Sequence, residues 1–167
     1  MSSEPIVDHA QLRIVEERSL QCISVRKSRR LQTDPSALPS EPNALEGTAE
    51  QGSVRIEPHA WLITSSTAGA HGAPYGSSSG MLVTEISDRL VAFRITGPRA
   101  TDIIAAGCDP AIVASGRFAR TRFASLATAM IQRWATDDYR VLVDVSIAWA
   151  FAEWLRRTAT LSVLPPA

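Results

Sequence analysis

The chain has 167 residues, and its 17 basic and 17 acidic side chains cancel to a formal net charge of zero. No overall field therefore attracts it to nucleic acid or to a membrane surface. Its hydrophobic content of 45% and its mean hydropathy of zero are typical of a globular chain. This length predicts one domain over residues 1–167, with one moderate core.

The compartment is predicted from what the sequence lacks. No apolar run approaches the roughly 18 residues that a membrane span needs, and residues 1–11 have neither the basic nor the apolar region of a secretion signal. Cys22 and Cys108 are far apart in sequence. Without an export signal, we expect both to be reduced, packed thiols and the protein to be cytoplasmic.

The first half of the chain is predicted to contain little regular structure. A short extended segment is expected at Gln21–Val25, and the basic run Arg26–Arg30 after it is interpreted as a solvated turn. Long loops are predicted at 27–53, which is rich in Pro, Ser, Glu and Gly, and at 65–80, where small residues dominate. Between these loops, Val54–Thr64 resumes order and ends in an apolar strand.

Thr84–Val113 is the best patterned segment. Apolar residues alternate with others over residues 91–96, as in a half-buried strand, and Gly97-Pro98 then ends the strand. A helix is predicted to follow and to end at Gly107, a natural C-terminal glycine. Its predicted apolar face consists of Ala100, Ile103 and Ile104.

The last third predicts a hairpin followed by a helix. Leu126–Trp134 and Tyr139–Val143 resemble two strands with a short connection. A helix is expected over Ile147–Thr158, with Ser146 as its N-cap. The order β, α, β, β, α predicts an α+β fold, with few helices on one side of an antiparallel or mixed sheet.

A search for chemistry finds no catalytic residue, cofactor site or metal site to propose. The histidines, His9, His59 and His71, occur singly, and neither cysteine lies near one at metal-ligand spacing. No phosphate loop and no nucleophile elbow occurs. The close carboxylate pairs, Glu85 with Asp88 and Asp137 with Asp138, stand beside predicted strand ends, where acidic residues commonly cap or turn the chain.

Trp149 departs from the pattern of the last helix. At roughly 100° per residue it projects about 160° from Phe151, away from the apolar stripe. A tryptophan on a polar face often marks a partner surface, although a neighbouring strand or loop could equally cover it. We therefore predict a subunit interface at Trp149, together with Arg156 and Arg157 near the C-terminal end of the helix.

Four segments together resemble one family: Leu38–Gly47, Ile56–Thr64, Glu85–Ile112 and Asp137–Arg157. The family is the gamma subunit of heterotetrameric sarcosine oxidase. Its fold resembles that of the folate-binding aminomethyltransferases of the glycine cleavage system. The resemblance is stronger in the second half of the chain, where several motifs occur in order.

The resemblance implies a place in an αβγδ complex that oxidatively demethylates sarcosine to glycine and releases hydrogen peroxide. It implies FAD and covalent FMN on the beta subunit, NAD and tetrahydrofolate on the alpha subunit, and zinc on the delta subunit. On this chain it implies no cofactor and no catalytic residue, but a structural role in assembly. It implies neither a nucleic-acid nor a membrane partner.

The sequence departs from the family at three places. Helices that members usually carry are replaced by Ser28–Ala37 and Ser65–Gly80, and a Gly-x-Cys-Ala-Gln-Thr pattern appears as the sequence GRFART at Gly116–Thr121. These differences leave open a related complex that oxidises another N-methylated amino acid. A stand-alone folate-binding protein of the aminomethyltransferase type, and an adaptor that binds through the basic run, are the other hypotheses.

Overall fold

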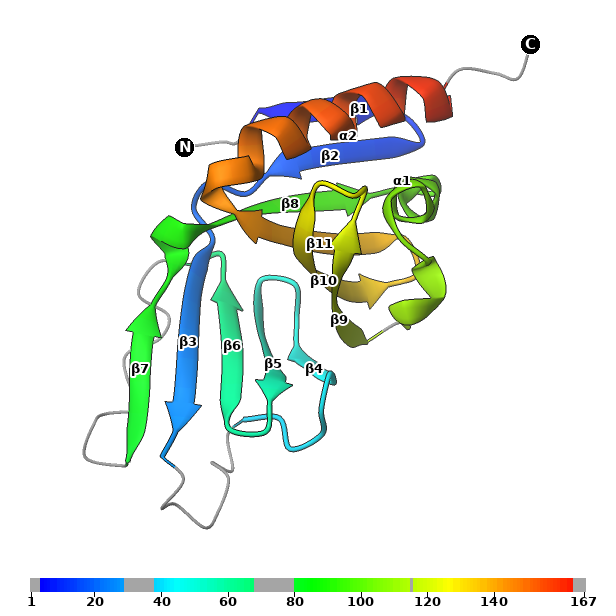
Figure 1. The fold of residues 1–167 in the computed structure, drawn as a ribbon. Helices are drawn as coiled ribbons and strands as arrows, with labels where there is room; N and C mark the ends of the chain where they lie inside the picture. The colour runs from blue at the N-terminus through cyan, green and yellow to red at the C-terminus, as the bar shows by residue number, and fades with distance from the viewer. Residues whose placement is uncertain (1–3, 29–37, 68–79, 115, 164–167) are drawn as a thin grey trace. The chain divides into compact units, whose positions relative to one another are not determined.

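A computed structural model describes residues 4–28, 38–67, 80–114 and 116–163 (Figure 1). The chain forms two compact units. Unit 1 comprises Met1–Arg18 and Arg89–Ala167, and unit 2 comprises Ser19–Asp88. The expectation of one domain over residues 1–167 stays a prediction.

Unit 1 is built on a six-stranded sheet whose neighbouring strands are all antiparallel. The strand order, which can be followed in Figure 1, is β1-β2-β8-β11-β10-β9. The strands are β1 (Pro5–His9), β2 (Leu12–Glu16), β8 (Leu90–Thr96), β9 (Arg117–Phe123), β10 (Ala127–Ala135) and β11 (Asp138–Asp144). The helices are α1 (Ala100–Gly107) and α2 (Ala148–Val163), with short 3-10 turns η3 (Pro110–Ile112) and η4 (Val145–Ile147).

The main core of unit 1 lies between this sheet and the two helices. Phe93 of β8, Phe123 of β9 and Phe151 of α2 are at most 1% exposed, with ring centroids 5.4 and 5.3 Å from Phe151. Burial of each such side chain stabilises the fold by about 1.5–3 kcal/mol. The predicted apolar residues of α1, Ala100, Ile103 and Ile104, belong to the same core.

Two glycines shape the connections of α1. Gly97 adopts φ +109°, and a Cβ there would approach the carbonyl oxygen of Gln11 to 2.7 Å, so the turn after β8 requires glycine. Gly107, by contrast, is not left-handed; a Cβ there would lie 2.0 Å from the ring of Phe123. The predicted helix end is therefore correct, but this glycine is needed for close packing against an aromatic ring.

Unit 2 contains a five-stranded antiparallel sheet with the order β4-β5-β6-β3-β7. The strands are β3 (Gln21–Lys27), β4 (Leu45–Gly47), β5 (Gln51–Glu57), β6 (Ala60–Ser65) and β7 (Met81–Glu85), followed by the 3-10 turn η2 (Ser87–Arg89). Trp61 is completely buried beside Val25 and Leu38. Its indole N–H donates to the carbonyl oxygen of Pro39 at 2.8 Å, which satisfies its one polar group.

The fold class is confirmed as α+β with antiparallel sheets and few helices. The hairpin of β10 and β11 is also confirmed. The predicted N-cap is wrong: Asp144 accepts the backbone N–H of Ser146 at 2.9 Å and starts η4, and α2 begins only after that turn and continues to Val163. Asp144 was overlooked because it ends a strand.

Several strands were not predicted from the sequence. They are β1, β2, β4, β7 and β9. The predicted loop at 27–53 contains β4 and the start of β5. Most of Ser28–Ala37 and of Ser65–Gly80, where family helices are replaced, lies outside the described residues, as do His71, Arg29 and Arg30.

Candidate functional site

The described residues bring together no group of three His, Cys, Asp or Glu side chains that could hold a metal ion. His9 accepts the backbone N–H of Gln11 through Nδ1 at 3.3 Å, and His59 lies in the turn between β5 and β6. Cys22 and Cys108 form no disulfide bond in the structure, and they belong to different units. The pKa of Cys108 lies above its ordinary value, mainly because the thiol is partly buried and also because the Asp109 carboxylate is nearby. A raised pKa disfavours the thiolate, which is the nucleophilic form of cysteine.

The carboxylate pairs occupy structural positions. Asp138 receives two hydrogen bonds from the Arg94 guanidinium, at 3.1 and 2.9 Å, across β8 and β11. Glu85 accepts the hydroxyl of Ser87 at 3.0 Å beside η2. Glu85 and Asp138 therefore each accept a hydrogen bond from a neighbouring side chain, which supports structural roles for these two carboxylates.

A buried ion pair in unit 1 was not predicted from the sequence. The side chain of Arg140 is 1% exposed and that of Glu17 is 15% exposed, and the Arg140 fork donates to both Glu17 oxygens, with an Nη2–Oε1 distance of 2.9 Å. Arg140 also donates to Gln132 Oε1 at 3.3 Å. The sequence signal that could have indicated this pair is the position of Arg140 inside the apolar run of β11. The residues on either side of Arg140, Tyr139 and Val141, lie in the helix-side core.

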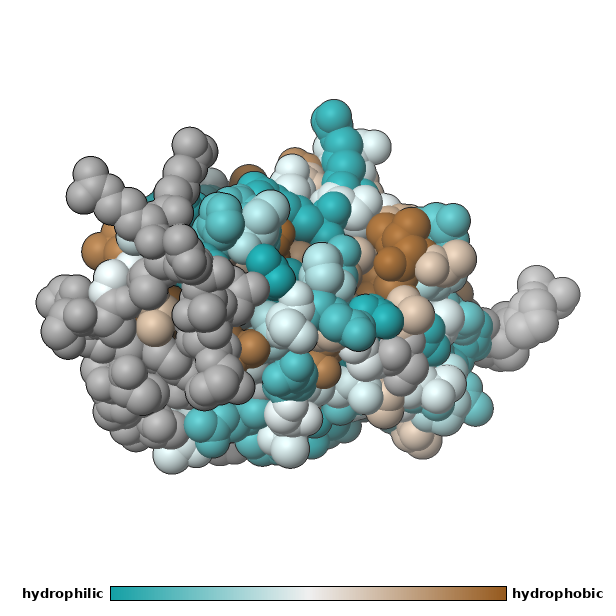
Figure 2. All heavy atoms as spheres, turned by 90° about the horizontal axis from the view of Figure 1, so that it is seen from below, coloured by the Kyte–Doolittle hydropathy of each residue, from teal (hydrophilic) through white to brown (hydrophobic). Residues whose placement is uncertain are grey.

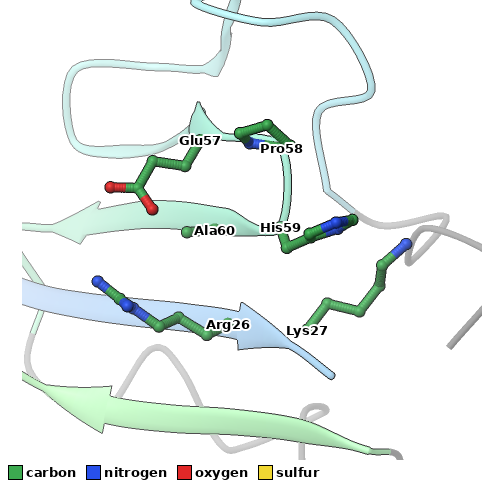
Figure 3. Close-up of a pocket in the computed structure, with 6 residues that line it drawn as sticks. All are labelled: Arg26, Lys27, Glu57, Pro58, His59 and Ala60. Carbon is green, nitrogen blue, oxygen red and sulfur yellow. The ribbon is translucent and has the colours of Figure 1, made fainter. Parts of the chain in front are cut away.

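A pocket of about 440 Å³ lies in unit 2 at the turn between β5 and β6, and Figure 3 shows its lining. Arg26 and Glu57 extend toward one side of this view, and Lys27 and His59 toward the other. Successive residues of a strand point to opposite faces, so the charges of Arg26 and Lys27 do not converge. The backbone N–H of Lys27 donates to the His59 carbonyl at 2.9 Å, and both basic residues end β3 instead of forming the expected turn.

The predicted interface residues lie on α2. Trp149 is 79% exposed, as its helical position predicted, and Val145, one turn earlier, is 53% exposed. Arg156 and Arg157 both reach Glu153, at 3.5 and 2.8 Å, so they brace the helix surface. The Arg157 hydrogen bond is the main cause that lowers the pKa of Glu153 below its ordinary value. Whether these residues contact a partner stays a prediction.

Exposed apolar surface is otherwise limited on the face that can be inspected. In the view of Figure 2, hydrophobic side chains form small separate patches among hydrophilic ones. Isolated apolar residues at a surface are ordinary, whereas a fully projecting tryptophan is not. No helix of the described residues is long and apolar enough to cross a membrane.

Solved structures provide the decisive comparison. No family model matches the chain, and no curated protein matches it by sequence. One chain of a heterotetrameric sarcosine oxidase from Corynebacterium sp. U-96 matches with a TM-score of 0.74 and 15% identity, over 96% of this chain and 91% of that chain. The protein has the aminomethyltransferase-like fold. The second match is the glycine cleavage system aminomethyltransferase T from Bartonella henselae, with a TM-score of 0.64 and 15% identity.

The two matches differ in how much of each known chain is covered. This chain is 88% covered in the match to aminomethyltransferase T but spans only 46% of that enzyme's length. In the sarcosine oxidase match, nearly all of both chains is aligned. At this identity the likeness defines the fold, and it confirms the fold that the sequence resemblance implied.

Proposed function

We propose that this protein is the gamma subunit of a heterotetrameric sarcosine oxidase-like flavoenzyme, with a structural role in assembly and no catalytic residue of its own. The observation that carries the proposal is the nearly complete mutual coverage with one chain of a heterotetrameric sarcosine oxidase, at 96% and 91%.

The proposed partners are the alpha, beta and delta subunits of such a complex, in the cytoplasm. FAD, FMN, NAD, tetrahydrofolate and zinc are proposed to reside on those subunits, and the complex is proposed to demethylate sarcosine oxidatively. A complex that acts on another N-methylated amino acid remains within this proposal, because a likeness at 15% identity supports the fold and does not specify the substrate.

The proposed contact with the other subunits is centred on Trp149. Its large ring projects from α2 with 79% of its surface exposed, and the neighbouring Val145 adds apolar surface. Arg156 and Arg157 share one carboxylate, that of Glu153, which leaves this part of the helix with a net positive charge. Tryptophan and arginine are the residues that most often dominate the binding energy of protein interfaces.

Purification of the tagged chain from its native host, with identification of the chains that copurify, tests the proposal. The expected result is a four-subunit complex with sarcosine oxidase activity. Trp149→Ala is expected to lower the recovery of the partner subunits about tenfold or more, since loss of an interface tryptophan costs roughly 2 kcal/mol or more.

The matched control is Leu161→Ala on the same helix, because Leu161 is also exposed, at 76%, but lies about 120° around the helix from Trp149. Unchanged recovery of partners with Trp149→Ala would contradict the interface, while failure of the wild-type chain to enter any complex would contradict the proposed function.

A stand-alone folate-binding protein is the second candidate, favoured by the match to aminomethyltransferase T. The chain spans 46% of that enzyme, so only about half of such an enzyme is present. Titration of the purified chain with tetrahydrofolate separates the two functions. Tight, saturable binding by the chain alone would favour the second candidate.

A further inference from the structure

A second hollow, of about 290 Å³, lies entirely within unit 1. Most of its sheet residues lie on the face opposite the helices, because Tyr139, Val141 and Val143 of β11 belong to the helix-side core and residues between them point the other way. Ala127 is the exception, since it pairs with Phe123 on the helix side. The lining is formed by Leu90, Arg120, Ala127, Thr128, Met130, Leu142, Asp144 and Ile147. This volume is at the lower end of the range of small-molecule pockets, about 300–1,000 Å³.

The floor of the hollow is apolar. Met130 is paired with Leu142 on one side and with Arg120 on the other, so the three side chains form one row across β11, β10 and β9. Leu142 is completely buried at the bottom, and Leu90 and Ile147 are partly buried at its sides. Such a floor favours the hydrocarbon part of a ligand.

The two charged groups of the rim differ in what they already bind. Asp144 accepts both the backbone N–H and the hydroxyl of Ser146, at 2.9 and 2.6 Å. The Arg120 side chain makes no ion pair or hydrogen bond within the part of the chain that the structure describes. In contrast, Arg94 and Arg140, on the same face of the sheet, each hold a carboxylate.

Arg120 and Leu142 are separated by two interstrand spacings, about 9.6 Å between backbones. A ligand of about six carbon atoms can therefore place an anionic end at the Arg120 fork while its chain lies over Met130 and Leu142. Asp144 stands at the other end and repels a second negative charge. The Thr128 hydroxyl adds a polar group at the rim.

We propose that this hollow binds a small apolar monocarboxylate, with its carboxylate at Arg120 and its hydrocarbon chain on the Leu90, Met130 and Leu142 floor. This site is independent of the proposed assembly role, which rests on α2. An arginine on an edge strand also prevents aggregation, but Arg122, on the same face of β9 and outside the hollow, serves that purpose equally.

The full-length chain labelled with ¹³C-methyl methionine provides the test. The sequence has three methionines; Met130 reports on the hollow in unit 1, and Met81 reports on effects in unit 2. The probes are hexanoate, hexanamide and adipate, which share six carbon atoms. The Met130 and Met81 resonances, assigned as the signals that Met130→Leu and Met81→Leu remove, are followed during titration of the wild-type chain by each probe.

Hexanoate is expected to shift the Met130 signal saturably without moving Met81. Hexanamide is expected to bind about tenfold more weakly because it lacks the charge-assisted hydrogen bonds to arginine. Adipate is expected to bind more weakly than hexanoate because Asp144 repels its second carboxylate. Arg120→Gln is expected to abolish the preference for the acid over the amide, whereas the matched Arg122→Gln retains it.

Four outcomes would overturn the proposal. They are no saturable shift with hexanoate, equal binding of the acid and the amide, equal loss in both arginine variants, and equal movement of Met81. The comparison of the three probes on the wild-type chain stands even if a variant fails to fold, which circular dichroism would reveal.

Discussion

Removal of the Glu17 carboxylate is expected to destabilise unit 1 strongly. Glu17→Gln keeps the size of the side chain but removes the negative charge that compensates Arg140. The Arg140 side chain is 1% exposed, so water cannot replace that charge. Breaking one half of a buried ion pair costs about 3–5 kcal/mol. Because Glu17 itself is 15% exposed, we expect the lower value, about 3 kcal/mol.

Urea denaturation followed by circular dichroism measures this loss as a change in the free energy of unfolding. For a chain of this size, about 3 kcal/mol corresponds to a decrease of about 6–12 °C in Tm. The matched control is Asp138→Asn on the same face of the sheet. Asp138 forms an ion pair with Arg94, and their side chains are 21% and 31% exposed, respectively. Solvent screening therefore limits the expected loss of stability to about 1 kcal/mol or less.

The double variant Glu17→Gln with Arg140→Met separates the cost of an uncompensated charge from the value of the pair. Replacement of a buried pair by apolar side chains of similar volume is often neutral, so the double variant is expected to be more stable than Glu17→Gln alone. A Glu17→Gln loss no larger than that of Asp138→Asn would refute the reasoning. A double variant less stable than Glu17→Gln would refute it as well.

Two further predictions concern the connections in unit 1. Gly107→Ala is expected to lower stability by about 1–3 kcal/mol in thermal unfolding, because the added methyl group would overlap the Phe123 ring; an unchanged or raised Tm would count against this. Two hydrogen bonds from Ser146 hold the pKa of Asp144 below its ordinary value of 3.8; the side-chain hydrogen bond has the larger effect and the backbone hydrogen bond the smaller. Asp144 therefore stabilises the fold above that pH and ceases to do so as the pH falls through its lower folded-state pKa. Asp144→Asn is expected to flatten the pH dependence of urea midpoints between pH 7 and pH 3, and an unaltered dependence would contradict the assignment.

The parts of the fold that were predicted correctly have local signals. The β8 strand, the turn at Gly97 and α1 follow from a change of hydrophobic period from 2 to about 3.6 within one segment. Trp149 was predicted to project from the apolar stripe because helical geometry alone determines its direction, and it is 79% exposed. These features depend on neighbours along the chain, so a single sequence is enough to locate them.

The strands that were missed have no such signal. β9 carries arginine at three of its seven positions, and its pattern resembles an exposed loop until β10 is found beside it. β1 and β4 are short edge strands whose partners are β2 and β5. Edge strands tolerate polar residues because only one side of the ladder is covered, so pairing instead of sequence pattern reveals them.

The sequence by itself determined the α+β class, the unit from β8 to α1, the outward direction of Trp149 and the family that the chain resembles. Tertiary structure decided which distant residues come together. It pairs Arg140 with Glu17, 123 residues earlier, and it places Arg120 beside the apolar floor of the hollow. The physical reason is that helix and turn signals act over a few residues. Ion pairs and hollows depend on strand order and register, which distant segments establish together.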